Sequence, residues 1–217
     1  MVTYNWKCPK IWQDGTAIII GGGLSVKIVD LRLIGNYYCI GVNSAFHLGD
    51  FVDVCFFGDA RWYNLEYGAL RGFKGFLVGL YPFKDRGEIG QTEGVDVNLM
   101  QRSRKGVGLT TRPGELCWNH SSGGAAVNLA VQLGAKKIIL VGFDMKAIDD
   151  KHNFHDRYPW NKDRPYRDPY RIHKRPWKGI AARAKKMGVK IINATLGSTI
   201  DAFPIMTLER AIADQNN

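Results

Sequence analysis

Three consecutive glycines, Gly21, Gly22 and Gly23, follow an apolar run near the start of the chain, and Ser25 stands two positions later. Glycine lets a backbone turn sharply and approach a ligand closely, because it carries no Cβ. A helix beginning at Ser25 would direct free N–H groups over the loop, and such a helix end favours anions. The pattern predicts a phosphate or nucleotide site, with a simple tight turn as the alternative.

Two histidines three positions apart, His152 and His155, lie in a stretch that also carries several acids. A neutral imidazole near pH 7 is a natural general base for deprotonating a hydroxyl group. A zinc site would need further ligands, for which Cys117 and His120 are candidates, but no other cysteine or histidine pair has ligand spacing. We therefore expect a general base and no metal site. The alternative is a surface loop with two solvated histidines.

A second anion-binding helix end is predicted at Ser121 and Ser122, which precede Gly123 and an apolar stretch that ends at Gly134. Either serine is a good N-cap, and Gly134 is a good C-cap. The N–H groups of the first turn would then face a phosphate or a ribose. A plain serine cap, with glycine for close helix packing, explains the same spacing.

Short polar side chains also follow other apolar runs of the chain. Ligands of open α/β sheets bind outside the carboxyl ends of the strands, although Asn, Asp and Ser at these places often only cap helices. Because five strand ends carry such residues, we favour a shared binding site. These residues are the Gly21–Ser25 loop, Asn43 with Ser44, Asp59 with Arg61, Asp144, and Asn193 with Thr195.

Strands and helices that alternate along the chain would position these residues. Short links between them favour right-handed crossovers and a mostly parallel sheet. The sequence therefore predicts an α/β, Rossmann-like, doubly wound fold in a single nucleotide-binding domain over residues 1–217. Strands are expected at 17–20, 37–42, 52–57, 76–78, 137–141 and 190–192, and helices at 123–134, 177–186 and 208–214.

Two stretches interrupt this alternation. Residues 85–113 are polar and rich in glycine, which predicts a loop with a short hairpin at most. Residues 151–178 carry nine Lys or Arg, three acids, four prolines and six aromatics. We expect an inserted basic lid that closes over a negatively charged donor. A nucleic-acid surface, with aromatic rings stacking on bases, and a solvated loop are the alternatives.

Composition limits the class of protein. The 217 residues are 45% apolar, enough for an ordinary core, and the net charge of +10 favours anionic substrates or polyanionic partners. No run reaches the ~18–20 apolar residues of a membrane span, and none near the start has the length of a signal peptide. The four cysteines are scattered, which favours free thiols in a reducing cytoplasm over disulfides.

Several of these motifs resemble those of a known superfamily. Residues 18–27, with their glycines and Ser25, look like the opening loop of bacterial sialyltransferases that use CMP-sialic acid, and of related pyrophosphokinase-like proteins from archaea and phages. Residues 41–46 are similar to the asparagine motif of their second strand. The most distinctive match is Ser122-Gly123 to Gly134, followed by a strand that ends at Asp144. The resemblance covers about residues 16–144, and phage-encoded proteins look closest.

This resemblance implies roles for individual residues. It assigns the catalytic base to His155, or else to His152, in the loop after the strand that ends at Asp144. It assigns the phosphate, ribose or base of a CMP-type nucleotide to the strand ends. Together with the strand-end pattern, the expected nucleotide-binding residues are Gly21, Gly22, Gly23, Ser25, Asn43, Ser44, Asp59, Ser121, Ser122, Gly123, Asp144, Asn193 and Thr195.

The sequence thus predicts a transferase that uses a nucleotide-sugar, with no firm cofactor and a histidine as general base. One alternative is a pyrophosphokinase-like enzyme that uses Mg²⁺ held by Asp59 and Asp144. The other is a non-catalytic phage protein that binds nucleotides, or nucleic acid through residues 151–178. In each case we expect a cytoplasmic location, in the host cytoplasm for a phage protein.

Overall fold

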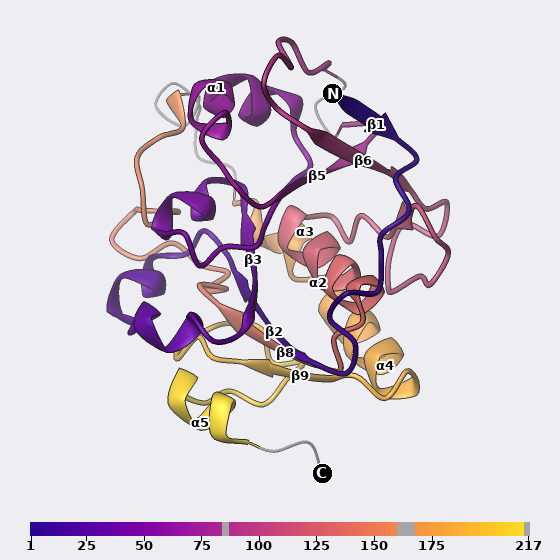
Figure 1. Cartoon of the computed structure of the whole chain (residues 1–217). Helices are drawn as coiled ribbons and strands as arrows, with labels where there is room; N and C mark the ends of the chain where they lie inside the picture. The colour runs from indigo at the N-terminus through magenta and orange to yellow at the C-terminus, as the bar shows by residue number, and fades with distance from the viewer. Residues whose placement is uncertain (84–86, 160–167, 215–217) are drawn as a thin grey trace.

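The computed structural model describes residues 1–83, 87–159 and 168–214. Within these residues a nine-stranded sheet is formed, and all its strand pairs are parallel (Figure 1). The strand order is β1-β6-β5-β4-β3-β2-β8-β9, with β7 paired to β6. The strands are β1 (Val2–Tyr4), β2 (Thr16–Ile20), β3 (Tyr38–Val42), β4 (Val54–Phe57), β5 (Phe76–Tyr81), β6 (Val97–Arg102), β7 (Glu115–Leu116), β8 (Lys137–Val141) and β9 (Lys190–Asn193).

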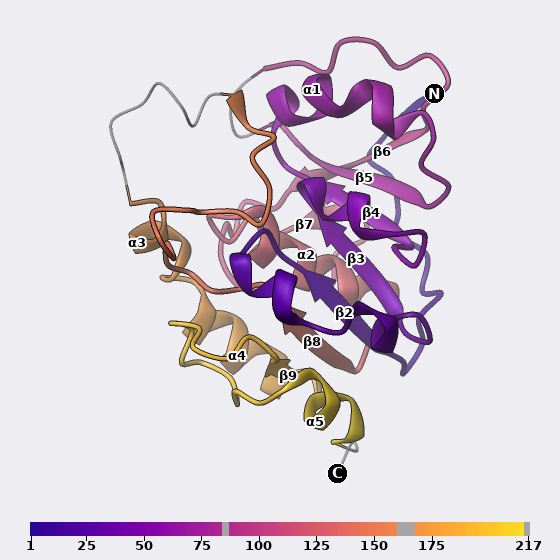
Figure 2. The same ribbon diagram turned by 90° about the vertical axis from the view of Figure 1, so that its left-hand side faces the viewer.

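Helices cover both faces of this sheet (Figures 1 and 2). On one face lie α2 (Ser122–Leu133) and α4 (Trp177–Lys186). On the other face lie α1 (Ala60–Leu70), α5 (Leu208–Ala213) and the 3-10 helices η1 (Leu24–Ile28), η2 (Leu31–Ile34) and η3 (Asn43–Leu48). The short α3 (Tyr170–His173) stands just before α4. The fold is therefore α/β and Rossmann-like, as the sequence predicts.

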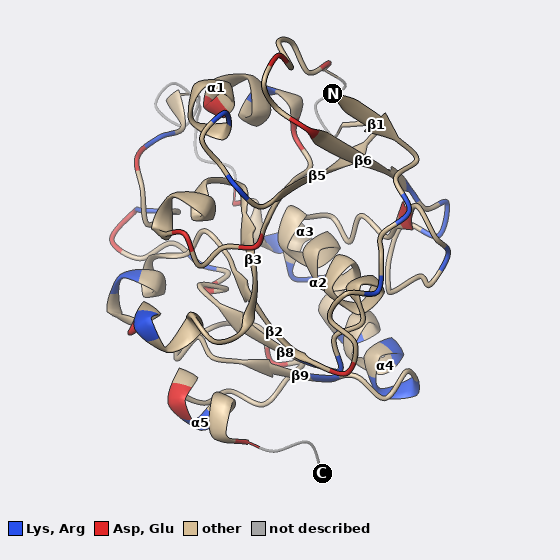
Figure 3. Cartoon of the chain, in the orientation of Figure 1, with Lys and Arg blue, Asp and Glu red and all other residues tan. Residues whose placement is uncertain are grey.

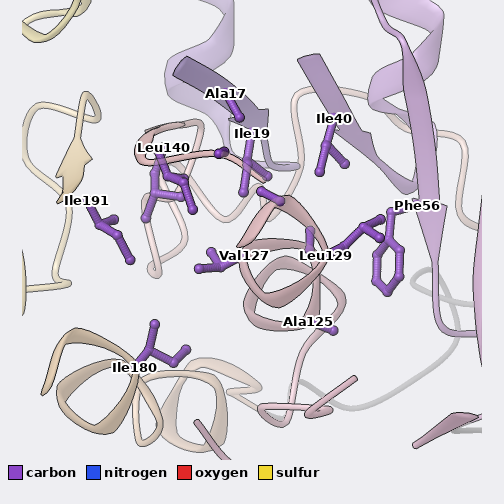
Figure 4. Packing of buried hydrophobic residues seen from close by; sticks show 14 of the residues in the cluster. Ala17, Ile19, Ile40, Phe56, Ala125, Val127, Leu129, Leu140, Ile180 and Ile191 are labelled. Atoms are coloured by element: carbon purple, nitrogen blue, oxygen red, sulfur yellow. The ribbon is translucent and has the colours of Figure 1, made fainter. Parts of the chain in front are cut away.

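The central strand β2 shows why the sheet is buried on both faces. Successive side chains of a strand point to opposite faces, and an all-apolar strand suits a sheet covered on both sides. Ala17 and Ile19 pack toward α2 and α4, whereas Ile18 and Ile20 pack toward α1 and α5. Figure 4 shows Ile19 and its neighbour Ile40 on β3 above the α2 side chains.

The strand order sets the place of a ligand site. From β2 the chain builds the sheet outward through β3, β4 and β5, and β8 and β9 are added on the other side of β2. The direction of winding therefore changes between β2 and β8. In doubly wound sheets the crevice at this change of direction, outside the carboxyl ends of the strands, is the usual binding site.

The main predicted elements are confirmed, but one prediction is wrong. Residues 85–113 were expected to form a loop, and they contain β6, which pairs with both β1 and β5. Three of its six residues, Asn98, Gln101 and Arg102, are polar, so the run is less apolar than the central strands. Helix α1 and strands β1 and β7 are additional to the prediction. Among the described residues, no helix is long and apolar enough to cross a membrane.

Candidate functional site

A cavity of about 900 Å³ opens where β2, β3, β4 and β8 end. It lies at the change of winding direction between β2 and β8, as expected for this fold. Ten of the predicted site residues line it: Gly21, Gly22, Gly23, Asn43, Asp59, Ser121, Ser122, Gly123, Asp144 and His152. Five others do not line it, namely Ser25, Ser44, His155, Asn193 and Thr195.

Asp144 occupies the position where the glycine loop was expected to hold a phosphate. Its Oδ2 accepts a hydrogen bond from Ser25 Oγ at 2.9 Å and lies 3.4 Å from the backbone N of Ser25. The helix that follows the loop, η1, is a five-residue 3-10 helix without a side-chain N-cap. Because a carboxylate already faces these donors, an anionic ligand would be repelled from this helix end.

The Asp144 carboxylate also explains why position 23 is a glycine. A Cβ at this position would lie 2.7 Å from Asp144 Cγ and 2.7 Å from the carbonyl oxygen of Gly142. The Gly23 N–H donates to that carbonyl at 2.9 Å, which ties the loop after β2 to the loop after β8. The glycine is therefore required by contact between two loops of the protein.

The N-terminus of α2 is open toward the cavity. Ser121 is its N-cap, with Oγ accepting from Gly124 N at 3.0 Å. The first intrahelical bond runs from Ala125 N to Ser121 O, so the N–H groups of Ser122 and Gly123 precede it and have no acceptor within the helix. Both residues line the cavity. This helix end can bind an anion by its N–H groups and its dipole.

Asn119, which the sequence analysis missed, holds this helix start in place. It is fully buried, and its backbone lies in the left-handed region at φ 53°. Its Nδ2 donates to the carbonyls of Gly108 at 2.9 Å and Gly124 at 3.0 Å, and its Oδ1 accepts from Gly108 N at 2.7 Å. Asparagine tolerates this backbone region better than most residues, which is the signal in the sequence.

His152 is the predicted base that lies at the cavity. Its Nδ1 is 3.1 Å from the hydroxyl of Tyr170 on α3, and that hydroxyl donates to the carbonyl of His152 at 3.3 Å. When the hydroxyl donates to the carbonyl, its oxygen accepts from Nδ1–H. The neutral ring then carries its lone pair on Nε2, the tautomer suited to accept a proton.

His155 lies away from the cavity wall. Its ring meets those of Phe154 and Tyr158 edge-on, with centroids 4.8 and 4.7 Å away, and Nδ1 accepts from Arg157 N at 3.2 Å. Burial, followed by the nearby Arg157 charge, lowers the pKa of His155 to about 4. Such a group is neutral at pH 7 and a weak base. The geometry thus favours His152 over His155, the reverse of the order expected from sequence.

Ser44 lies behind the cavity wall, in a buried network that sequence reasoning missed. Its hydroxyl donates to Glu66 Oε1 at 2.9 Å and accepts from Trp62 Nε1 at 3.0 Å. The other oxygen of Glu66 is 2.8 Å from His47 Nε2. Because Trp62 lines the cavity, Ser44 supports the wall. The sequence signal was the i, i+4 spacing of Trp62 and Glu66 on α1.

Asn193 and Thr195 are buried and position the loop after β8. Thr195 Oγ1 accepts from the backbone N of Phe143 at 3.0 Å, and Asn193 Oδ1 accepts from Thr195 N at 3.1 Å. Asn43, in contrast, lines the cavity at φ 53°, and its buried Oδ1 has no hydrogen-bond partner among the described residues. A buried acceptor without a donor costs about 1–3 kcal/mol.

The predicted basic lid, residues 151–178, borders the cavity from two sides. His152, Asn153 and Tyr158 line it before residues 160–167, which lie outside the described residues, and Tyr170 and His173 line it after them. The Phe154 N–H donates to Gly22 O at 2.9 Å, so the first part rests on the glycine loop. The predicted end at Lys178 runs into α4, whose Trp177 is only 2% exposed.

The acids that could hold Mg²⁺ are engaged in other contacts. Asp59 is the N-cap of α1, where it accepts from Arg61 N at 3.1 Å. Asp144 faces Ser25, as described above. Within residues 1–83, 87–159 and 168–214, no group of three His, Cys, Asp or Glu side chains is arranged to hold a metal ion.

The fold of this chain is similar to that of solved glycosyltransferases. Among solved structures, the MAf glycosyltransferase from Magnetospirillum magneticum AMB-1 is similar over 97% of this chain, with a TM-score of 0.61 and 12% identity. This chain spans 36% of that protein, about a third of its length.

Two sialyltransferase structures are also similar to this chain in fold. The sialyltransferase CST-II in complex with a trisaccharide acceptor and CMP matches 88% of this chain and 86% of its own, with a TM-score of 0.50 and 14% identity. The Campylobacter jejuni CstII complex with cytidine-5'-monophosphate matches 90% of this chain and 86% of its own, with a TM-score of 0.52 and 14% identity. At these identities the likeness concerns the fold. No family model and no curated protein matches the sequence.

Proposed function

We propose that the protein transfers a sugar from a nucleotide-sugar donor to an acceptor hydroxyl. The observation that carries this proposal is the cavity itself, which joins His152 and the open N-terminus of α2 at the change of winding direction. Its volume of about 900 Å³ suits a ligand of nucleotide-sugar size. The glycosyltransferase-like fold supports the same reaction class.

The donor phosphate is proposed to lie at α2. The N–H groups of Ser122 and Gly123 face the cavity, whereas the other candidate helix end is occupied by Asp144. Trp118, next to these residues in the cavity wall, offers an aromatic surface for the base. By the resemblance to sialyltransferases, the base is cytosine.

His152 is proposed as the general base. As the acceptor oxygen forms its bond to the anomeric carbon, its proton passes to Nε2 of His152. The bond between the anomeric carbon and the donor phosphate breaks, and the phosphate keeps the electron pair. The N–H groups of α2 stabilise this developing negative charge, which is electrostatic catalysis.

Nucleotide binding is tested by thermal unfolding of the protein with CMP, UMP, GDP, ADP and ATP. A ligand present at 100 times its dissociation constant adds about 2.7 kcal/mol of stability. We expect CMP to stabilise the wild type and Gly123→Val to lose that gain. Absence of stabilisation by every nucleotide would refute the proposal. Stabilisation by ATP alone, with turnover that requires Mg²⁺, would favour the pyrophosphokinase alternative instead.

The base is tested with two histidine variants, assayed by release of CMP from CMP-sialic acid. His152→Ala should lower turnover about 10²–10⁴-fold while the stabilisation by CMP is kept, as general-base catalysis predicts. The matched control, His155→Ala, should leave turnover near the wild-type value. Loss of turnover in His155→Ala alone would assign the general-base role to His155 instead.

A further inference from the structure

A basic surface lies beside the cavity and is not used by the proposed reaction. Residues 169–190 contain eight Lys or Arg and no Asp or Glu. Six of the basic residues are exposed, and four of these, Arg171, Lys174, Arg175 and Lys178, lie close together in the sequence. Arg171 lies on α3, Lys174 and Arg175 lie in the turn that joins α3 to α4, and Lys178 lies on α4. The two helices follow one another at one side of the molecule (Figure 2), and Figure 3 shows Lys and Arg on α4.

Three of these residues surround a groove. Lys174, Arg175 and Lys178 line a hollow of about 320 Å³ together with Thr199 and Asp201. The one acidic side chain in this wall, Asp201, lies 4.0 Å from Lys178, and both side chains are about four-fifths exposed, at 80% and 83%. Such a pair in water neutralises little. The groove therefore keeps an excess of positive charge and has room for a phosphate headgroup.

Two exposed aliphatic side chains stand within three positions of groove residues in the sequence. Ile172 on α3 is 45% exposed, and Leu196, in the loop that leads to Thr199, is 59% exposed. Lysine and arginine beside exposed aliphatic residues are typical of surfaces that bind the interface of an anionic bilayer. In such surfaces, the lysine and arginine side chains contact the lipid headgroups, and the aliphatic side chains insert at the boundary between the headgroups and the acyl chains.

The aromatic residues of this region argue against a nucleic-acid surface. Single-stranded nucleic acid is bound by exposed rings that stack on bases. Trp177 is instead buried, in edge-on contact with Phe143 at 5.7 Å and Phe203 at 5.9 Å. Tyr170 is turned toward His152, to which it is hydrogen-bonded.

We propose that the α3–α4 face binds a membrane surface rich in anionic phospholipids, with headgroup phosphates in the groove of Lys174, Arg175 and Lys178. Tyr170 and His173 of α3 also line the large cavity, so docking by this face brings the cavity next to the headgroups. A lipid-borne acceptor would follow from this placement. That consequence rests on the proposed transferase function, whereas the docking does not.

The test is co-sedimentation of the whole protein with vesicles of phosphatidylcholine, alone or with phosphatidylglycerol, in the absence of nucleotide. Wild type should sediment only with the anionic vesicles. Each Lys or Arg near such a surface contributes about fivefold in affinity, so Lys174→Gln/Arg175→Gln/Lys178→Gln should bind about 100-fold more weakly. Binding should also fall steeply when salt shortens the screening length from ~10 Å at 0.1 M to ~3 Å at 1 M.

A second triple variant separates this face from net charge. Lys7, Lys10 and Lys74 are exposed and lie outside α3 and α4, and their change to Gln gives the same total charge. This control should keep wild-type binding. Equal loss in both triple variants, or no binding of wild type to anionic vesicles, would overturn the proposal. Binding to duplex DNA that exceeds vesicle binding and is lost only in the α3–α4 variant would replace it with a nucleic-acid surface.

Discussion

The contact between the loops after β2 and β8 makes Gly23→Ala an informative substitution. The backbone of Gly23 has φ −71° and ψ 157°, which any residue adopts, so the cost comes from contact alone. The new Cβ would lie 2.7 Å from both Asp144 Cγ and Gly142 O. Relief requires the Asp144 carboxylate to leave Ser25, which costs about 1.5–3 kcal/mol for a charged hydrogen bond.

Overpacking against the backbone of Gly142 adds about 1–3 kcal/mol. We therefore expect the free energy of unfolding to fall by about 2.5–6 kcal/mol, measured by urea denaturation. For a chain of this size, the melting temperature should fall by about 5–24 °C. Gly22→Ala is the matched control, because its Cβ would meet only the end of the Asn153 side chain, at 3.0 Å. It should cost about 1 kcal/mol or less.

A double-mutant cycle tests whether loss of the hydrogen bond between Ser25 and Asp144 contributes to the destabilisation by Gly23→Ala. Asp144→Ala should cost less in the Gly23→Ala background than in the wild type, because the carboxylate has already lost Ser25 there. The difference should be about 1.5–3 kcal/mol, the value of the lost bond. Additive costs, or a Gly23→Ala variant as stable as Gly22→Ala, would refute the reasoning.

Three further substitutions test other parts of the fold. Burial lowers the pKa of His155 from 6.5 to about 4, so the unfolded chain binds a proton that the native state does not, and stability should fall as pH drops from about 6.5 to about 4. His155→Gln should flatten this decline in urea titrations, and equal slopes would contradict the assignment. Lys137 is buried and its Nζ donates to the carbonyls of Ile212, at 3.0 Å, and Asp214. Lys137→Met should cost about 1.5–3 kcal/mol in thermal unfolding, and unchanged stability would show these bonds to be unimportant. Gly68 lies within α1 with no atom within 4 Å of an added Cβ. Gly68→Ala should gain about 0.5–1 kcal/mol, and a loss would contradict the open surroundings.

The fold was predictable where local pattern and tertiary environment agree. After their first residues, Thr16 and Lys137, strands β2 and β8 are apolar because both their faces are buried, and Gly134 ends α2 at φ 109°. Strand β6 was missed because half of its residues are polar, and its pairing with β5 is decided by residues about 20 positions earlier. Helix α1 has two aromatic residues in its first turn and a glycine near its end, which weaken its helical pattern.

The site was predictable as a place, but less so as a set of contacts. Strand-end residues such as Asn43 and Ser122 do reach the cavity. That Asp144 faces Ser25, and that Ser44 binds Glu66 behind the wall, depends on the registers between strands. The resemblance to sialyltransferases ranked His155 above His152, but a motif match carries no information on which of the two rings lies at the cavity.

The all-parallel strand order has a consequence for how the chain folds. Ile18 pairs with Ile139, and Val2 pairs with Val97, so neighbouring strands are joined by long connections. Closing such connections costs chain entropy before any contact compensates for it, and domains dominated by distant pairs fold in about milliseconds to seconds. During synthesis, the glycine loop that follows β2 emerges well before α2 and His152, which line the same cavity. A nucleotide that binds as proposed should therefore stabilise only late folding intermediates, after β8 has joined β2.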